Sequence, residues 1–260
     1  MNTQVSDNTP MVELCGVGKR FGAMWAVRDV TFAVQPGCVT GLLGPNGCGK
    51  TTLLRLCAGL LRPDTGTVRI AGVTQGPEAV VARAQLGMVS ADAPLMNELT
   101  VAQALELQGI LQGLRGAALR AACAHVTEEF ALGDFLHRRV QVLSTGMRQR
   151  AAIASAMMHA PRVLLLDEPT VGLDPDVRAH LWNCLRALAA RGVALLLSTH
   201  YLEEVVRVCD WAHLLVRGTL SLSMNVRAME GSVTALEQAF FAALLQEQSP
   251  CEQVCTSGSR

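Results

Sequence analysis

The stretch GPNGCGKTT at 44–52 restricts the possible folds of this chain more than any other part of it. Its spacing is Gly-x-x-x-x-Gly-Lys-Thr, and it stands between an apolar run at 39–43, which predicts a buried strand, and a helical run from Lys50 onward. Glycines let the backbone curl until its N–H groups converge, and the N-terminus of the next helix adds positive charge. The pattern therefore predicts a phosphate-binding loop in an α/β protein.

Further signals predict a buried parallel sheet around this loop. The apolar runs 163–166 and 193–197 are continuous, which is typical of parallel strands covered on both faces. Between them, Asp174 and Pro175 mark the start of a helix and Gly192 marks its end. We also expect a strand at 67–70, a strand at 211–216 with a turn at 217–218, and antiparallel strands within 12–34.

A helix-rich segment interrupts these strands. Thr100 and Gln103 form a capping box that predicts a helix start. The broad apolar face expected for that helix consists of Leu105, Leu107, Ile110, Leu111 and Leu114. We therefore predict a disordered N-terminus at 1–11, a nucleotide-binding domain at 12–225 with a helical subdomain inserted at about 92–160, and a C-terminal helix with a polar tail at 226–260.

Composition narrows the class of protein. The 260 residues have a formal net charge of zero, which argues against a nucleic-acid-binding surface. No apolar run approaches the ~18 residues that span a bilayer, and the N-terminus has no secretory pattern. The nine cysteines are scattered and indicate reduced thiols rather than a disulfide framework. These features predict a soluble, cytosolic enzyme that acts on a nucleotide.

Residues at the expected strand ends supply the chemistry. Lys50 would reach the β- and γ-phosphates of a nucleotide, and the Thr51 hydroxyl would bind Mg²⁺. Asp167 would hold Mg²⁺ through water and Glu168 would polarise the attacking water, unless the two form an ordinary acidic strand end. His200 would reach the γ-phosphate, or else be a capped or core histidine. The predicted nucleotide-binding loop, which would bind ATP if the chain resembles an ATPase, comprises Gly44, Pro45, Asn46, Gly47, Cys48, Gly49, Lys50, Thr51 and Thr52.

A second anion-binding helix start follows Leu143. Ser144 and Gly146 stand at the N-terminus of a helix predicted at 147–159. With this motif the chain resembles the nucleotide-binding subunits of ATP-binding-cassette (ABC) transporters, whose signature is usually Leu-Ser-Gly-Gly-Gln. The runs 44–51 and 163–168 match the family's Walker A and Walker B motifs, 172–174 its D-loop and 198–200 its switch histidine. The resemblance covers about 12–216.

The resemblance implies a fold and a mechanism. The fold is a P-loop NTPase with a RecA-like parallel-sheet core, an N-terminal antiparallel β subdomain and an inserted helical subdomain. Two cassettes, identical or related, would sandwich two ATP molecules, so that the signature of one meets the ATP of the other. The signature residues are Ser144, Thr145, Gly146 and Met147, with Asp174 in the D-loop. Phe21 would stack on adenine, or else be a core residue of the antiparallel sheet.

The resemblance also implies a location and partners. The chain would lie at the cytoplasmic side of the cell membrane and act on a permease formed by a separate chain. Ala91 stands where the family has a glutamine, and Thr145 and Met147 depart from the usual signature. The departures in the signature resemble the branch of the family that exports drugs, sodium or polysaccharides. The run 236–240 also resembles the Leu-Glu-Asp-x-Phe box that ends such cassettes. The alternative for this run is an amphipathic C-terminal helix.

Two other functions stay open. One is a soluble ABC-type ATPase that acts on ribosomes or DNA, and the other is a regulatory cassette with weak hydrolysis, which Ala91 allows. Cys48 raises a separate question, because the field that binds phosphate would favour its thiolate and lower its pKa if the thiol is accessible. The alternative is that Cys48 is a small residue packed inward.

Overall fold

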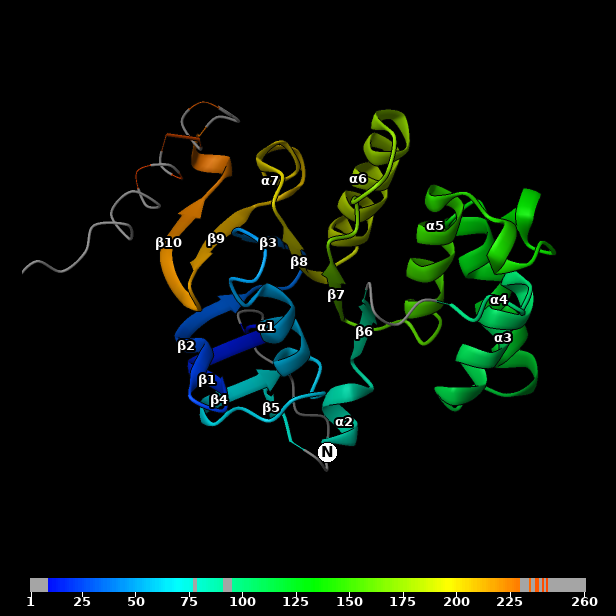
Figure 1. Ribbon diagram of the computed structural model, residues 1–260. Helices are drawn as coiled ribbons and strands as arrows, with labels where there is room; N and C mark the ends of the chain where they lie inside the picture. Colours follow the sequence, from blue (N-terminus) through cyan, green and yellow to red (C-terminus); the bar gives the residue numbers. More distant parts are fainter. Residues whose placement is uncertain are drawn as a thin grey trace, which may run out of the picture.

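A computed structural model describes residues 9–76, 79–90 and 95–229, and also residues 234, 237, 238, 240 and 242. Two sheets organise the fold (Figure 1). The smaller is antiparallel, with the strand order β2-β1-β4-β5. Its strands are β1 (Val12–Phe21), β2 (Met24–Val34), β4 (Thr65–Ile70) and β5 (Val73–Thr74). The antiparallel strands expected within 12–34 and the strand expected near 67–70 are confirmed.

The larger sheet has the strand order β10-β9-β3-β8-β7-β6. All neighbouring strands are parallel except for the hairpin of β9 and β10. The strands are β3 (Val39–Leu43), β6 (Leu86–Val89), β7 (Val163–Asp167), β8 (Ala194–Thr199), β9 (Trp211–Val216) and β10 (Thr219–Asn225). The carboxyl ends of β3, β6, β7 and β8 therefore lie along one edge, which is where parallel sheets bind ligands.

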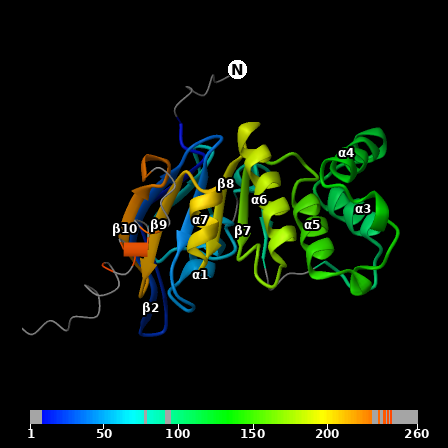
Figure 2. The same cartoon turned by 90° about the horizontal axis from the view of Figure 1, so that it is seen from above.

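Helices cover both faces of the parallel sheet. α1 (Lys50–Cys57) lies on the face toward the antiparallel sheet, and α6 (Pro175–Ala190) and α7 (Leu202–Val208) lie on the other (Figures 1 and 2). The remaining helices are α2 (Val80–Arg83), α3 (Val101–Leu111), α4 (Gly116–Glu129) and α5 (Thr145–Ala156), with 3₁₀ turns at Gly133–Phe135, Val140–Val142 and Arg227–Met229. α3, α4 and α5 form the helical subdomain beside the β6 edge.

The central strands explain why their sequences are continuously apolar. On β8, Leu195 and Leu197 pack into the core cluster of α6 and α7, whereas Leu196 packs into the cluster around α1. Strand side chains alternate between faces, so a sheet buried on both faces requires apolar residues at every position. All of β3, β7 and β8 is buried.

The helix boundaries follow the capping signals. Asp174 is the N-cap of α6, Pro175 is its first residue, and Gly192 beyond its end has φ 92°. At α3, the Thr100 N–H donates to Gln103 Oε1 at 2.9 Å and the Gln103 N–H donates to Thr100 Oγ1 at 3.2 Å. The capping box and the boundaries of α6 are confirmed, because both depend on local hydrogen bonding.

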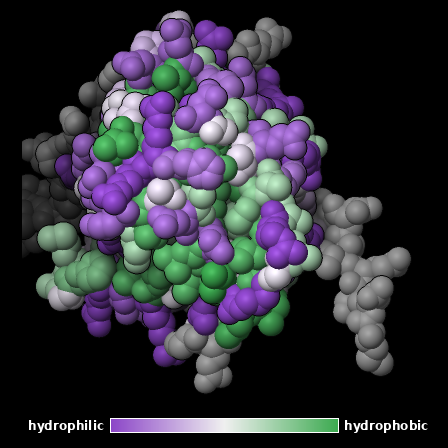
Figure 3. Space-filling model, turned by 90° about the vertical axis from the view of Figure 1, so that its right-hand side faces the viewer, coloured by the Kyte–Doolittle hydropathy of each residue, from purple (hydrophilic) through white to green (hydrophobic). Residues whose placement is uncertain are grey.

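The apolar face expected for α3 is only partly buried. Leu105 is 1% exposed, but Ile110 is 37% and Leu111 is 71% exposed. This end of the molecule carries a contiguous apolar area (Figure 3). The groove there has a volume of about 290 Å³ and its lining includes Met96, Leu107 and Leu111. The helical period correctly predicted an apolar stripe on α3. It could not predict which part of that stripe other elements of the protein cover.

Both ends of the chain differ from expectation or lie partly outside the described residues. Met11, expected in a disordered segment, is 2% exposed, and its N–H donates to the Val34 carbonyl at 2.8 Å. β10 was not predicted. Of the 236–240 box, positions 236 and 239 are outside the described residues, and Phe240 packs against the main core. Within the described ranges, no helix combines the length and apolarity needed to cross a bilayer.

Candidate nucleotide-binding site

A cavity of about 630 Å³ lies at the carboxyl edge of the parallel sheet. The loop after β3 lines one side, and the ends of β6, β7 and β8 line the other. The lining residues are Ala26, Asn46, Gly47, Gly49, Lys50, Thr51, Thr52, Val89, Ser90, Gln149, Asp167, Glu168, Val171 and His200. Six of the nine expected loop residues therefore line the cavity together with the acidic pair and the histidine, whereas Gly44, Pro45 and Cys48 do not line it.

The loop 44–49 has a backbone that requires glycine. Gly49, the N-cap of α1, has φ 111°, and a Cβ on it would lie 2.3 Å from the Ala26 carbonyl oxygen. Gly47 has φ 79° and faces open space. Lys50 Nζ donates to the carbonyl oxygens of Gly44 at 2.8 Å and Pro45 at 3.2 Å. The lysine is therefore held over the loop, beside the N-terminus of α1, where an anion is stabilised.

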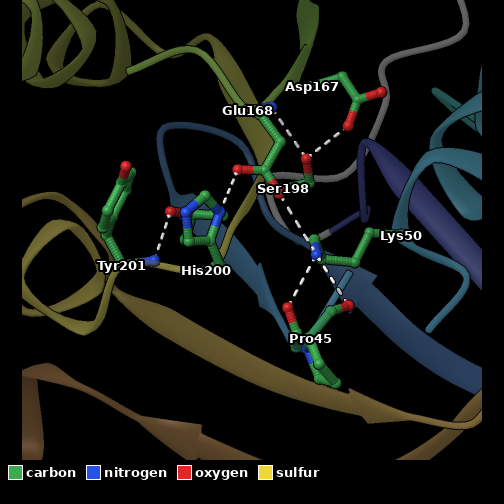
Figure 4. Close-up of polar contacts among 9 residues, drawn as sticks. Pro45, Lys50, Asp167, Glu168, Ser198, His200 and Tyr201 are labelled. Atoms are coloured by element: carbon green, nitrogen blue, oxygen red, sulfur yellow. Dashed lines mark hydrogen bonds and ion pairs between the residues drawn. The ribbon is translucent and has the colours of Figure 1, made fainter. Parts of the chain in front are cut away.

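Four side chains from neighbouring strand ends meet in front of this loop (Figure 4). Ser198 Oγ donates to Asp167 Oδ1 at 2.6 Å. Glu168 Oε1 lies 3.3 Å from Lys50 Nζ, and Glu168 Oε2 lies 2.7 Å from His200 Nδ1. Glu168 therefore stands between the loop lysine and the histidine, within reach of a molecule in the cavity.

Glu168 has a strained backbone. Its φ is 50°, in the left-handed region that residues with a Cβ rarely adopt. The Glu168 N–H donates to Ser198 Oγ at 2.9 Å, which fixes the turn. Strain of this kind costs about 1–3 kcal/mol and is concentrated at functional sites. The turn directs the side chain into the cavity, next to Lys50 and His200.

Thr51 and Asp167 provide oxygen ligands suited to Mg²⁺. Both line the cavity, one from α1 and one from β7. In the described ranges, no group of three or more His, Cys, Asp or Glu side chains forms a metal site. Mg²⁺ at a nucleotide needs few protein ligands, because phosphate and water oxygens complete its shell. The residues present therefore fit a Mg²⁺ ion that arrives with a nucleotide.

The signature residues lie elsewhere. Ser144 is the N-cap of α5, and its Oγ accepts the Met147 N–H at 3.3 Å. Ser144 and Thr145 are exposed, and neither lines the cavity. Gly146 is buried against α6, where an added Cβ would lie 2.5 Å from Val177 Cγ1. Asp174 is exposed at the start of α6. The signature residues and Asp174 therefore do not line the cavity of their own chain.

Phe21 and Ala91 are two further residues whose roles the structure does not establish. Phe21 is 54% exposed at the β1–β2 hairpin, so the interpretation as a core residue is wrong. Phe21 is not among the cavity-lining residues, and its role toward adenine stays a prediction. Ala91 lies outside the described residues.

Sequence reasoning assigned no role to several residues of the site. Ser198 bonds both Asp167 and the Glu168 backbone, although it was quoted only as part of the 198–200 match. Gln149 and Ser90 line the cavity from α5 and from the end of β6. Ser198 shares its strand end with His200, so the spacing of two residues was the available signal. Gln149 gave none, because its approach depends on how α5 packs.

The burial of Cys48 contradicts the hypothesis that its thiol is activated. It is 5% exposed, and a Cβ on Gly44 would lie 2.6 Å from its Sγ. Burial raises the pKa of the Cys48 thiol, and this outweighs the opposing effects of Lys50 and of backbone N–H groups. The field of the loop is present, but desolvation of the thiolate is the larger effect. Of the two interpretations of Cys48, the small residue packed inward is therefore confirmed.

We therefore expect Cys48 to resist alkylation. Native protein treated with a maleimide should be modified at exposed Cys15, whereas Cys48 should react only after denaturation. Peptide mapping by mass spectrometry of native and urea-treated samples measures both sites. Modification of Cys48 at the rate of Cys15 in native protein would contradict the burial argument.

Curated relatives include an ATP-binding protein named for export and another named for drug resistance. The Nod factor export ATP-binding protein I of Ralstonia nicotianae is 40% identical over 203 residues, which are 78% of this chain and 63% of that protein. The daunorubicin resistance ATP-binding protein DrrA3 of Streptomyces coeruleorubidus is 42% identical over 195 residues, which are 75% of this chain and 62% of that protein. The chain thus spans less than two thirds of the length of these relatives.

Solved structures agree with the fold. The ATP-binding subunit of an ABC transporter has a TM-score of 0.79 and 29% identity, over 90% of this chain and 99% of the other. A dimeric ATP-binding cassette in a post-hydrolysis state, bound to ADP and Pi, has a TM-score of 0.75 and 26% identity, over 84% and 99%. A sequence profile described as ABC transporter matches residues 27–171, more than half of the chain. This chain belongs to the ABC transporter family, as an ATP-binding cassette.

Proposed function

We propose that this protein is the ATP-hydrolysing subunit of a transporter and drives export through a permease formed by a separate chain. The observation that carries the proposal is the meeting of Lys50, Asp167, Glu168 and His200 in one cavity in front of the phosphate-binding loop. A regulatory cassette needs to bind ATP only, and it has no use for a carboxylate and a histidine held 2.7 Å apart.

Each side chain has a distinct part in hydrolysis. Backbone N–H groups of 44–52 and Lys50 would bind the phosphates. Glu168 would accept a proton from the attacking water, and His200 would orient Glu168 and donate toward the γ-phosphate. Thr51 and Asp167 would hold a Mg²⁺ ion, which neutralises phosphate charge when bound.

A second cassette would complete the site. The exposed N-terminus of α5 with Ser144, and the exposed start of α6 with Asp174, do not line the cavity of their own chain. Helix N-termini attract anions, so the N-terminus of α5 with Ser144 suits the ATP of a partner cassette. The related cassette solved as a dimer with ADP and Pi supports this arrangement.

The permease would dock on the apolar groove beside α3. Exposed Leu111 and Met96 line that groove, and an exposed apolar area of this kind marks interaction sites. Relatives are named for Nod factor export and daunorubicin resistance, which supports export. We propose that the protein lies peripherally at the cytoplasmic side of the membrane. Which substrate is exported depends on the permease.

The test combines ATPase assays with recovery of the partner. A tagged protein purified from detergent-solubilised membranes should hydrolyse ATP and retain an integral-membrane protein. Leu111→Glu should reduce that recovery about tenfold and preserve ATP hydrolysis, because a charge at an apolar interface is costly to bury. Leu60→Glu is the matched control, since Leu60 is 66% exposed and lies outside the groove. Recovery of ribosomes or DNA in place of a membrane protein would overturn the proposal.

A further inference from the structure

Glu204 is a buried carboxyl behind the candidate site. It lies in the first turn of α7, four residues after His200, and is 0% exposed. Over the described ranges it forms no ion pair. Burying a carboxyl group costs free energy unless hydrogen bonds compensate, so its partners require an explanation.

Side chains that can donate a hydrogen bond approach Glu204 from α6, from β8 and from the loop after Glu168. The Trp182 Nε1–H of α6 donates to Glu204 Oε1 at 3.2 Å. Burial raises the pKa of the Glu204 carboxyl, and the Thr199 and Thr170 hydroxyls beside it, together with Trp182, counteract that rise. Thr199 ends β8, and Thr170 lies in the loop after Glu168.

Two of these atoms are still without a partner in the present arrangement. Glu204 Oε2 and Thr170 Oγ1 are both buried and neither has a hydrogen bond to a described residue. A carboxylate oxygen can only accept, and a hydroxyl can rotate to donate. A small approach of Thr170 therefore satisfies both atoms. Thr199 Oγ1 accepts the Tyr201 N–H at 3.0 Å, so its own proton is free to be donated to the carboxylate.

We propose that Glu204 is a positioning residue for ATP hydrolysis, whose carboxylate joins the loop after Glu168 to the strand end before His200. The connection runs through the hydroxyls of Thr170 and Thr199. Thr170 is two residues after Glu168, and Thr199 directly precedes His200. Glu204 therefore fixes the backbone on both sides of the 2.7 Å contact between Glu168 and His200, without touching ATP. This inference rests on the proposed ATPase function.

Substitutions that remove the connection should lower turnover without weakening ATP binding. Glu204→Ala and Thr170→Val should each lower kcat about tenfold or more and change KM less than about twofold, because misplacing catalytic groups affects the chemical step. Glu204→Gln should retain most of the rate, since its amide can accept from Trp182 and donate to the Thr170 hydroxyl. Glu203→Ala is the matched control, because Glu203 is the exposed neighbour on α7.

Assays run below the melting temperature of each variant separate positioning from loss of fold. An unchanged kcat in folded Glu204→Ala would overturn the inference, as would loss of activity in Glu204→Gln equal to that in Glu204→Ala. A crystal structure of Glu204→Ala gives a readout that needs no activity: His200 Nδ1 and Glu168 Oε2 should lie beyond hydrogen-bond distance, and an intact contact would also overturn it. If the wild type and Glu203→Ala fail to hydrolyse ATP, the proposed function fails, and the crystal structure still decides the role of Glu204.

Discussion

Glu168→Gln should bind ATP but almost stop hydrolysing it. The carboxylate lies between Lys50 and His200 in the cavity, so it is the group placed to take a proton from water. Gln keeps the shape of the side chain and cannot accept that proton. Lys50 also loses its 3.3 Å contact with a carboxylate oxygen and becomes more available to phosphates. ATP affinity should therefore stay the same or increase.

The expected loss of turnover is about 100- to 10,000-fold, the range for removal of a general base. Phosphate release measures the rate, equilibrium binding of labelled ATP measures the affinity, and size exclusion with Mg-ATP should show an accumulating dimer. Glu203→Gln makes the same chemical change at an exposed position of α7 and should behave as the wild type. Hydrolysis by Glu168→Gln at a rate near that of the wild type would show that another group is the base.

Local rules predicted the elements that depend on local interactions. The loop glycines, the N-cap Asp174 and the pair of Thr100 and Gln103 all act within a few residues of the chain. The continuous apolar strands predicted a sheet buried on both faces, and the two core clusters on β8 confirm it. These features could be predicted because neighbouring residues are sufficient to produce them.

Features that depend on packing between distant segments were missed. Leu111 was assigned to an apolar face, but its exposure could not be predicted, because helical periodicity does not tell which neighbour covers an apolar stripe. The sequence left open whether the Cys48 thiol is accessible or packed inward, and contacts around Gly44 bury its sulfur. The strand β10 was missed, although the positive φ angles of Arg217 and Gly218 at its hairpin turn match the turn that was expected there.

The residues of the candidate site also divide into those with a local sequence signal and those that depend on packing between distant segments. Lys50, Asp167, Glu168 and His200 were predicted because each stands at a strand end or loop of recognisable spacing. Glu204 carries no such signal, since a glutamate in the first turn of a helix usually faces water and interacts with the helix N-terminus. Its burial results from the packing of α7 on α6, which the sequence of either helix alone does not specify.

Acid should destabilise the fold through His213. This residue of β9 is 5% exposed, its ring centroid lies 4.5 Å from that of Phe32, and its Nδ1 lies 2.8 Å from Ser223 Oγ. His213 Nε2 is buried and has no partner among the described residues. Burial lowers the pKa of His213 from 6.5 to about 4. A proton on Nε2 would introduce a charge that the folded protein cannot solvate or pair.

The direction of the pH effect follows from proton binding. In the unfolded chain His213 takes up a proton as the pH falls below about 6.5, whereas in the folded protein it stays neutral until the pH approaches about 4. The stability is therefore complete above pH 6.5 and is lost as the pH falls through this window. The loss amounts to about 2 kcal/mol at pH 5 and about 3 kcal/mol at pH 4.

Urea unfolding of the wild type and His213→Phe across this pH range isolates the effect. Phe keeps an aromatic ring against Phe32 and removes both nitrogens, and the Ser223 hydroxyl is exposed and can bond water in their place. The variant should lose about 2 kcal/mol less than the wild type between pH 7 and pH 5. His137→Phe replaces an exposed histidine and should retain the acid sensitivity of the wild type. Equal acid sensitivity in the wild type and His213→Phe would mean that other groups cause the loss of stability, because only His213 has been removed from the titration.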